Sequence, residues 1–516
     1  MKPLLLITVL ALPAQTPSLE GLKEHAFQRV EARRAFTQVM VDSIFSFSEL
    51  GFQEFETSKY ITGLLEREGF RITRGVAGMP TAFVAEWGSG KPVIGFMADI
   101  DGLPETSQKP GVAYRDPLIP GGPGHGEGHN AGQAVNVTAA LAVKELLEKY
   151  KIPGTIRVYP GVAEELLASR NYMVRAGLFK DLDAMLSCHV SSDFSTGYGP
   201  SGTALISTQF SFHGRSAHGA GSPWMGRSAL DAVELMNIGW NYRREHLRPA
   251  HRAHYVITHG GDQPNVVPPE ASVWYFFREL DFEHLRDLHA LGVKIARAAA
   301  EMTDTTMTER ILAGTWESHM NKPLAEALHA NIKAVGMPAW SDPDQALARA
   351  AQKELGSKPE GLRLKINELR PPAESERGGG AGSDDIAEVS WNLPTVNLRY
   401  PSNIPGLVGH HWSSGIAMAT PIAHQGATAG AKAQAMTAIE LLVRPALVEA
   451  AWTYFRDVQT KDRKWQSLVP EGTAAPAELN RERMTRFRPG LEKLRYDPSR
   501  YKTYLEQLGI QYPTVR

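Results

Sequence analysis

Two hydrophobic patterns alternate along most of the chain. Continuous apolar runs such as Val93–Ala98 and Ala184–Val190 are typical of strands buried on both faces of a parallel sheet. Residues 131–150 instead place apolar side chains three and four positions apart, which predicts a helix. Strands that alternate with helices predict an α/β fold with a mostly parallel sheet. Further helices are expected at 19–47, 57–68 and 429–442, and further strands at 155–159 and 394–398.

The middle of the chain has a different order of elements. Residues 202–214 alternate between apolar and polar positions, as a half-buried strand does. The pattern then predicts a helix at 227–245, strands at 254–258 and 271–277, a helix at 282–300 and a strand at 306–312. This β-α-β-β-α-β order is that of a ferredoxin-like α+β unit. We therefore expect a split catalytic domain (19–200 and 316–450), an inserted domain (201–315) and a helical C-terminal extension (451–516).

Composition narrows the possible chemistry. The 516 residues can bury more than one core, and the net charge of −1 argues against bulk electrostatic binding of nucleic acid. The single Cys excludes an intramolecular disulfide and a Cys-rich metal site. Any metal must therefore be bound mainly by histidine and carboxylate.

The first residues resemble an export signal. Lys2 precedes the apolar run Leu4–Leu12, and Ala14 follows it. This pattern predicts a signal peptide over residues 1–14, and hence a periplasmic or secreted protein, with a cytoplasmic one as the alternative. No later segment has 18 uninterrupted apolar residues, so no membrane span is expected.

Acidic and imidazole side chains recur where the predicted strands end. In open α/β sheets, ligands bind beyond the carboxyl ends of the strands. Asp99 and Asp101 follow the first apolar strand, Glu164-Glu165 follow the next, and His189 ends a third. Other candidates precede the helix at 131 or follow the late strand: Glu127, His129, His410, His411 and His424.

These side chains suggest a metal-dependent hydrolase. Of the adjacent pair Glu164-Glu165, one carboxylate can bind a metal while the other acts as general base on water. Each residue alone also has an ordinary explanation, such as a surface acidic pair or a hydrogen-bonded core histidine. Serine hydrolysis is disfavoured because the chain has no Gly-x-Ser-x-Gly motif. Five residues together supply enough donors for two divalent ions: Glu127, His129, Glu165, His189 and His424.

The motifs resemble those of the M20 metallopeptidase and amidohydrolase family, in particular its branch of aminobenzoyl-glutamate hydrolases and N-acyl-amino-acid amidohydrolases. The resemblance covers roughly residues 25–445. Its motifs, in family order, are Phe47–Phe52, Ala98–Pro104, Gly126–Asn130, Ala163–Glu165, Ser216–His218, Gly226–Ala232, Pro264–Pro268 and Ile422–His424.

The resemblance implies a role for each matching residue. Glu164 matches the general base, and His218 matches a histidine that reaches into the partner subunit's site to stabilise the oxyanion. Asn265 matches a substrate-binding residue. The inserted domain matches the family's dimerisation domain, so a homodimer is implied. The matching metal ligands are His129, Glu165, His189 and His424.

One position departs from the family pattern. Glu127 stands where this branch usually has a metal-binding cysteine. A carboxylate is a harder ligand than a thiolate, which favours Zn²⁺ or Mn²⁺, with Co²⁺ as a third option. Alternatively, Glu127 only hydrogen-bonds nearby. Asp99 stands where many other members have a ligand histidine, and Asp101 is expected to orient a ligand imidazole.

The resulting hypothesis is a two-metal amidohydrolase. It would cleave the amide bond of an N-acyl amino acid, including one with an aromatic acyl group, or of a related small amide. One alternative is a dipeptidase or carboxypeptidase with the same site. Another is a metal-binding homologue without turnover, which the glutamate at position 127 motivates.

Overall fold

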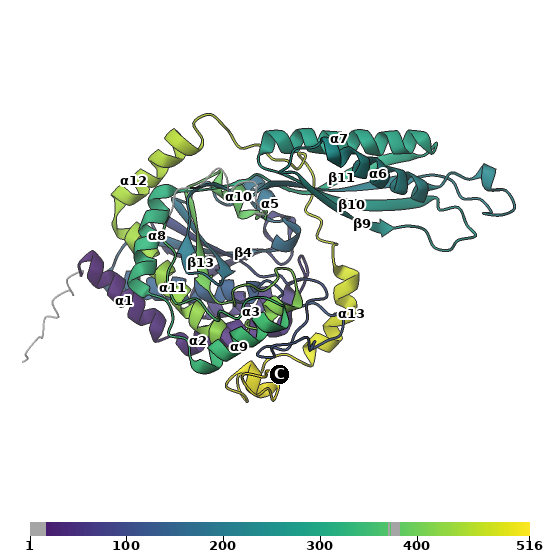
Figure 1. Cartoon of the computed structure of the whole chain (residues 1–516). Coiled ribbons are helices and arrows are strands. Elements are labelled where there is room, and N and C mark those ends of the chain that lie inside the picture. The colour runs from purple at the N-terminus through teal and green to yellow at the C-terminus, as the bar shows by residue number, and fades with distance from the viewer. Residues whose placement is uncertain (1–16, 370–371, 373–381) are drawn as a thin grey trace, which may run out of the picture.

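A seven-stranded sheet forms the centre of the larger domain in the computed structural model, which describes residues 17–369, 372 and 382–516 (Figure 1). The predicted signal peptide at 1–14 therefore lies outside the described residues. From edge to edge the strands are β1 (Arg71–Arg74), β2 (Phe83–Ser89), β4 (Gly154–Gly161), β3 (Val93–Asp99), β5 (Ala184–Ser191), β13 (Thr395–Pro401) and β6 (Ser195–Thr196).

The centre of this sheet is parallel. Strands β4, β3, β5 and β13 pair in parallel, whereas β1, β2 and β6 join the edges antiparallel. All residues of β3 are buried, as its continuous apolar run predicts. The mostly parallel sheet expected from the sequence is thus confirmed.

Two long helices cover the sheet on the side of its central strands. Helix α4 (Gly132–Tyr150) packs on β3, β4 and β5, and α11 (Pro421–Val443) packs on β13 and on α4. The alanines and glycines of α11 let it be buried on nearly every side. At Gly426 a Cβ would lie 2.1 Å from the Pro401 carbonyl oxygen, so only glycine allows this approach.

Further helices and a short two-stranded sheet complete the larger domain. Residues 19–47 form two helices rather than the one expected. Among the described residues, no helix combines the length and apolar character that a bilayer crossing requires. The remaining elements are α1 (Leu19–Glu31), α2 (Arg34–Phe47), α3 (Phe55–Arg67), α5 (Arg170–Arg175), α8 (Lys322–Val335), α9 (Asp342–Glu354), α10 (Ile386–Ser390), β7 (Gly199–Ser201) and β12 (Ser318–Met320).

The inserted segment forms a separate layer beside the larger domain (Figure 1). Its antiparallel sheet has the order β11 (Thr306–Thr315), β8 (Ala204–His213), β10 (Glu270–Glu279) and β9 (Arg252–His259). Helices α6 (Ala229–Arg243) and α7 (Phe282–Met302) both pack on β10 around an aromatic core. The predicted ferredoxin-like α+β unit is confirmed.

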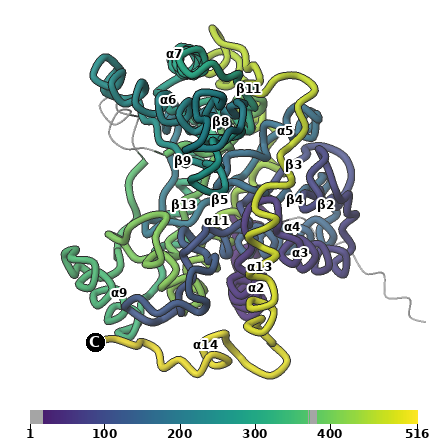
Figure 2. Tube along the Cα trace, turned by 90° about the vertical axis from the view of Figure 1, so that its right-hand side faces the viewer, coloured from purple at the N-terminus to yellow at the C-terminus, as the bar shows by residue number. Residues whose placement is uncertain are grey.

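The C-terminal segment runs along the outside of the molecule (Figure 2). It comprises α12 (Pro445–Tyr454), a π-helical turn, α13 (Arg481–Glu492) and α14 (Tyr504–Gln507). Glu478 pairs with Arg310 of β11 at 2.5 Å, and the Tyr504 amide donates to Asp42 of α2 at 3.0 Å. The segment therefore contacts both domains.

Candidate metal centre

Three neighbouring parallel strands bring polar side chains to one edge of the sheet. Asp99 ends β3, Glu164-Glu165 form a turn directly after β4, and His189 lies near the end of β5. Because the carboxyl ends of parallel strands meet at one edge, these side chains lie close together.

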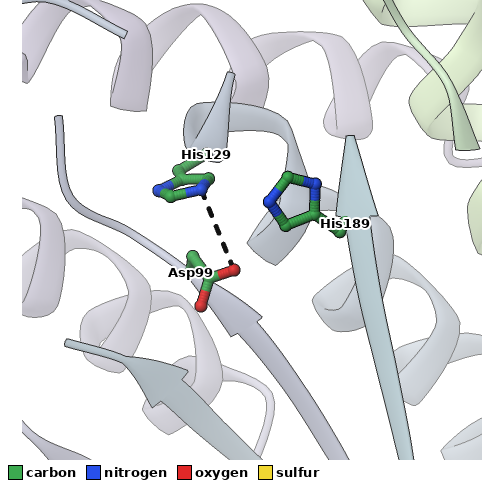
Figure 3. A group of neighbouring side chains, drawn as sticks. All are labelled: Asp99, His129 and His189. Carbon is green, nitrogen blue, oxygen red and sulfur yellow. Dashed lines mark ion pairs between the residues drawn. The ribbon is translucent and has the colours of Figure 1, made fainter. Parts of the chain in front are cut away.

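His129 joins this group from the start of α4. The preceding Gly128 has a φ of +119°, and a Cβ there would lie 2.7 Å from the Met418 side chain, so glycine is required. The His129 and His189 rings are 5.3 Å apart at 85°. Figure 3 shows both rings beside Asp99, whose Oδ2 lies 3.9 Å from His129 Nε2.

The potential ligand atoms form overlapping groups within 4.8 Å. Glu127 belongs to two of them. Its Oε1 lies 3.4 Å from His189 Nε2, and its Oε2 lies 3.3 Å from His410 Nε2. Three groups include histidine: Asp99-His129-His189, Glu127-His129-Glu164 and Glu127-Glu165-His410. A fourth, Glu164-Asp384-Asp385, is wholly acidic.

The hydrogen bonds of the two buried imidazoles fit metal binding. His129 Nδ1 lies 3.3 Å from Asp101 Oδ1, while its Nε2 is buried without a hydrogen-bond partner. His189 Nδ1 lies 2.9 Å from the Val190 carbonyl oxygen, which leaves Nε2 to face Glu127. When Nδ1–H donates, the Nε2 lone pair is free for a metal, the usual arrangement of a histidine ligand. Imidazole and carboxylate donors suit Zn²⁺ or Mn²⁺.

The crowding of carboxylates has electrostatic consequences. Burial, reinforced by Asp99, raises the pKa of Glu164 well above its ordinary value. Burial, reinforced by Glu127, does the same for the pKa of Glu165. Burial also opposes ionisation of Glu127, but the hydrogen bond from His410 and the charge of His189 outweigh it and lower its pKa. Cations bound among these oxygens would offset this repulsion.

Two further carboxylates hold the acidic turn in place. Asp101 Oδ2 accepts a hydrogen bond from the Glu165 amide at 3.1 Å. Glu54 accepts one from the Ala163 amide at 2.8 Å, where the Ala163 φ of +49° is unusual for a residue with a side chain. Asp101 thus contacts both His129 and the Glu165 backbone, as expected of an orienting residue.

Asp99 has a second partner. The fully buried Arg170 guanidinium contacts both Asp99 and Asp385. Asp99 is therefore shared between a structural ion pair and the candidate ligand group.

His424 is not brought to this centre. It lies in the first turns of α11, and its Nε2 is 2.6 Å from Asp42 Oδ1 on α2. Among the described residues, no candidate ligand group contains it. The expected metal-ligand position of His424 is corrected by the structure, because the helix begins at Pro421 and directs this ring to α2. The histidine that approaches Glu127 and Glu165 is His410.

His218 and Asn265 lie together on the inserted domain, outside the centre. The Gly219 amide donates to the Asn265 carbonyl at 2.9 Å, and His218 forms a β-bridge with Val266. Both residues are exposed. Neither lines the cavity next to the candidate ligands.

That cavity, of about 930 Å³, lies between the two domains. Glu127, Glu164 and His189 line one part of it, and Arg278 of β10 and Arg399 of β13 line others. Sequence reasoning missed both arginines, for which no motif gave a signal. It also missed His410 as a ligand, although His410-His411 directly follows the late strand.

Comparison with known proteins defines the class of this molecule. Residues 95–391 match the model of Peptidase family M20/M25/M40, and the chain belongs to that family. It is 35% identical over 443 residues to a p-aminobenzoyl-glutamate hydrolase polypeptide of Escherichia coli (strain K12), covering 81% of this chain and 92% of the relative. It is 27% identical over 451 residues to mouse Xaa-Arg dipeptidase, covering 85% and 93%.

A solved structure agrees on the fold. Aminobenzoyl-glutamate utilization protein from Klebsiella pneumoniae superposes with a TM-score of 0.52 at 17% identity, covering 82% of this chain and 97% of that one. The family consists of hydrolases that act on amide bonds, and this chain shares their sequence pattern and fold.

Proposed function

We propose that this protein is a metal-dependent amidohydrolase that cleaves an N-acyl amino acid with two divalent ions, Zn²⁺ or Mn²⁺ with Co²⁺ as a third option. The observation that supports this most is the group of imidazole and carboxylate donors around Glu127, in which His129 Nε2 is buried and unpartnered. When bound, the metal pair supplies Lewis-acid activation of a water molecule and of the scissile carbonyl.

The residues of the chain divide the remaining work. His129, Glu165, His189 and His410 would hold the ions, with Glu127 between them. Glu164 is 5% exposed at the cavity wall, and its raised pKa suits a base that takes a proton from water and returns it to the leaving amine.

Arg278 supplies an anchor for the amino-acid half of the substrate. It lines the cavity, its Nε is buried without a hydrogen-bond partner, and no ion pair to it exists among the described residues. Burial lowers its pKa, and the charge of Glu164 opposes that shift, which places the two groups near one another. An unpaired guanidinium is suited to bind the substrate carboxylate.

A homodimer would complete the site. His218 and Asn265 are exposed and lie outside the cavity of their own chain. We infer that they act in the partner subunit, where His218 stabilises the oxyanion and Asn265 binds substrate. Heterodimers of His218→Ala and Glu164→Gln chains should then regain activity that neither homodimer has.

Removal of the general base tests the proposal directly. Glu164→Gln should lower kcat for N-benzoyl amino acids at least about a thousandfold, because proton transfer is lost together with its coupling to water attack. Metal content, measured by mass spectrometry, should stay at the wild-type value. Glu368→Gln changes another cavity carboxylate, one already paired with Lys333, and should leave kcat within about threefold of the wild-type value, because the substitution breaks only a surface ion pair. Full activity of Glu164→Gln would contradict the assignment.

Dipeptide cleavage is the second candidate, motivated by the similarity to Xaa-Arg dipeptidase. A dipeptide ending in arginine would place a cation in the cavity that Arg278 and Arg399 line. Parallel assays with N-benzoyl amino acids and Xaa-Arg dipeptides distinguish the two reactions.

A further inference from the structure

Arg399 is a second unpaired arginine in the cavity. It is partly buried on β13, and none of its described neighbours forms an ion pair with it. Its register partner on the parallel strand β5 is His189, and side chains at paired positions of parallel strands extend to the same face of the sheet. Burial lowers the pKa of His189, and the Arg399 charge lowers it further, which agrees with this proximity.

Asn397 lies beside Arg399. It is two residues earlier on β13 and therefore on the same face of the strand. Asn397 also lines the cavity, is 9% exposed, and has an Oδ1 that is buried without a hydrogen-bond partner. A buried amide that makes no bond with the protein is expected to bond with a ligand or with water.

The other charged groups of the cavity wall are already satisfied. Glu368 pairs with Lys333 at 2.9 Å, and Asp384 accepts from the Ile386 amide at 2.8 Å. Arg252 donates to the carbonyl oxygens of Pro249 and His251. Apart from the carboxylates that two dications would offset, the charges left for a substrate are those of Arg278 and Arg399.

We propose that the preferred substrate carries two carboxylates, one bound by Arg278 and the other by Arg399 with Asn397. This inference rests on the proposed amidohydrolase function and narrows its substrate class to dicarboxylic amides. An N-acyl glutamate or aspartate has both carboxylates on the amine half, whereas an N-succinyl amino acid has one on each half. Arg399 is then the residue that distinguishes an acidic from a neutral substrate.

The test compares two substrates of equal shape. Metal-loaded wild-type protein should hydrolyse N-benzoyl-L-glutamate with a kcat/KM at least about tenfold above that for N-benzoyl-L-glutamine, since a buried arginine left without its carboxylate is costly. Arg399→Gln should reduce this ratio to near one, and Arg399→Lys should retain part of it. Arg252→Gln removes a cavity arginine that already has partners and should keep the ratio. N-succinyl-L-leucine against N-hexanoyl-L-leucine reveals whether the second carboxylate lies on the acyl half.

A binding measurement separates this inference from the proposed function. Calorimetry on metal-loaded protein should show tighter binding of free L-glutamate than of L-glutamine, or of succinate than of butyrate, with the preference lost in Arg399→Gln. If amides are hydrolysed but neither assay shows a preference for two carboxylates, the inference is wrong and the function stands. If no amide is hydrolysed although the Arg399-dependent binding preference is present, the function is wrong and the two-carboxylate site stands.

Discussion

His410 and His424 both follow the last strand of the sheet in sequence, and the structure gives them different roles. His410 is in a loop with its ring nitrogen between Glu127 and Glu165, whereas His424 is in a helix and bonds to Asp42. Asp42 also accepts from the Tyr504 amide, so His424 belongs to a buried structural network. A ligand and a structural histidine respond differently to substitution.

We expect His410→Ala to reduce bound metal from two ions per chain toward one. His424→Ala should keep two ions but lower the free energy of unfolding by about 1–3 kcal/mol, because Asp42 loses a partner in a buried site. Metal analysis and urea unfolding of both variants provide the measurement. Loss of metal in His424→Ala with full occupancy in His410→Ala would reverse the assignment.

Asp101 lies behind the ligands. Its carboxylate contacts His129 Nδ1 and the Glu165 amide, so it fixes both a ring orientation and a turn. Asp101→Asn should weaken metal affinity about 10- to 100-fold, as measured by competition with a chelator. Asp116→Asn, which changes an aspartate whose side chain pairs with Lys109 away from the centre, is the matched control. Equal affinities in the two variants would show that Asp101 has no such role.

At the scale of elements, the sequence predicted what burial periodicity records. Strand β3 is buried on both faces and β8 alternates in its second half, so a continuous run and an alternating run were informative. Helix α11 is buried nearly all round, so its residues 423–428 show no phase, and the expected helix began too late. That error left His424 in an expected loop. The direction of Arg399 depends on its pairing with β5, which local pattern cannot reveal.

Helix α10 contains a buried carboxylate with a pH-dependent cost. Burial raises the pKa of Glu388 to about 8, although the amide of Trp316 and the indole of Trp465 donate to it. The unfolded chain releases this proton near 4.5, so the folded state holds an extra proton between about pH 4.5 and 8. Folding stability therefore falls as pH rises through this window.

Glu388→Gln should remove that slope. The amide also loses hydrogen bonds, but this cost is the same at every pH, so the slope is the readout. Urea unfolding from pH 5 to 8 should show a flatter curve for the variant than for the wild type. Parallel curves would mean that Glu388 is ionised throughout the folded state.

At the scale of the whole molecule, the C-terminal segment joins the two domains. Arg463 pairs with Glu283 of α7 at 3.0 Å and with the buried Glu317, which directly follows the inserted sheet. Its guanidinium also lies 4.8 Å from the Trp316 ring and 4.9 Å from the Trp391 ring. These contacts tie the inserted domain, the junction and the larger domain to one side chain.

Arg463→Met should destabilise the protein by about 3–5 kcal/mol, because Glu317 is left buried without a cation. Adding Glu317→Gln should recover part of this loss, and Arg463→Lys should lose less than Arg463→Met. The free energy of unfolding in urea is the measurement. An equal loss in the single and double variants would show that the arginine acts through packing on the tryptophans and not through its charge.

The central claim is a two-metal centre built on Glu127, and anomalous X-ray diffraction at the absorption edge of the bound metal tests it most directly. We expect two anomalous peaks between the ends of β3, β4 and β5, both beside the Glu127 carboxylate, one near His129 and His189 and the other near Glu165 and His410. Peaks at His424, or fully loaded protein with no peak beside Glu127, would contradict it.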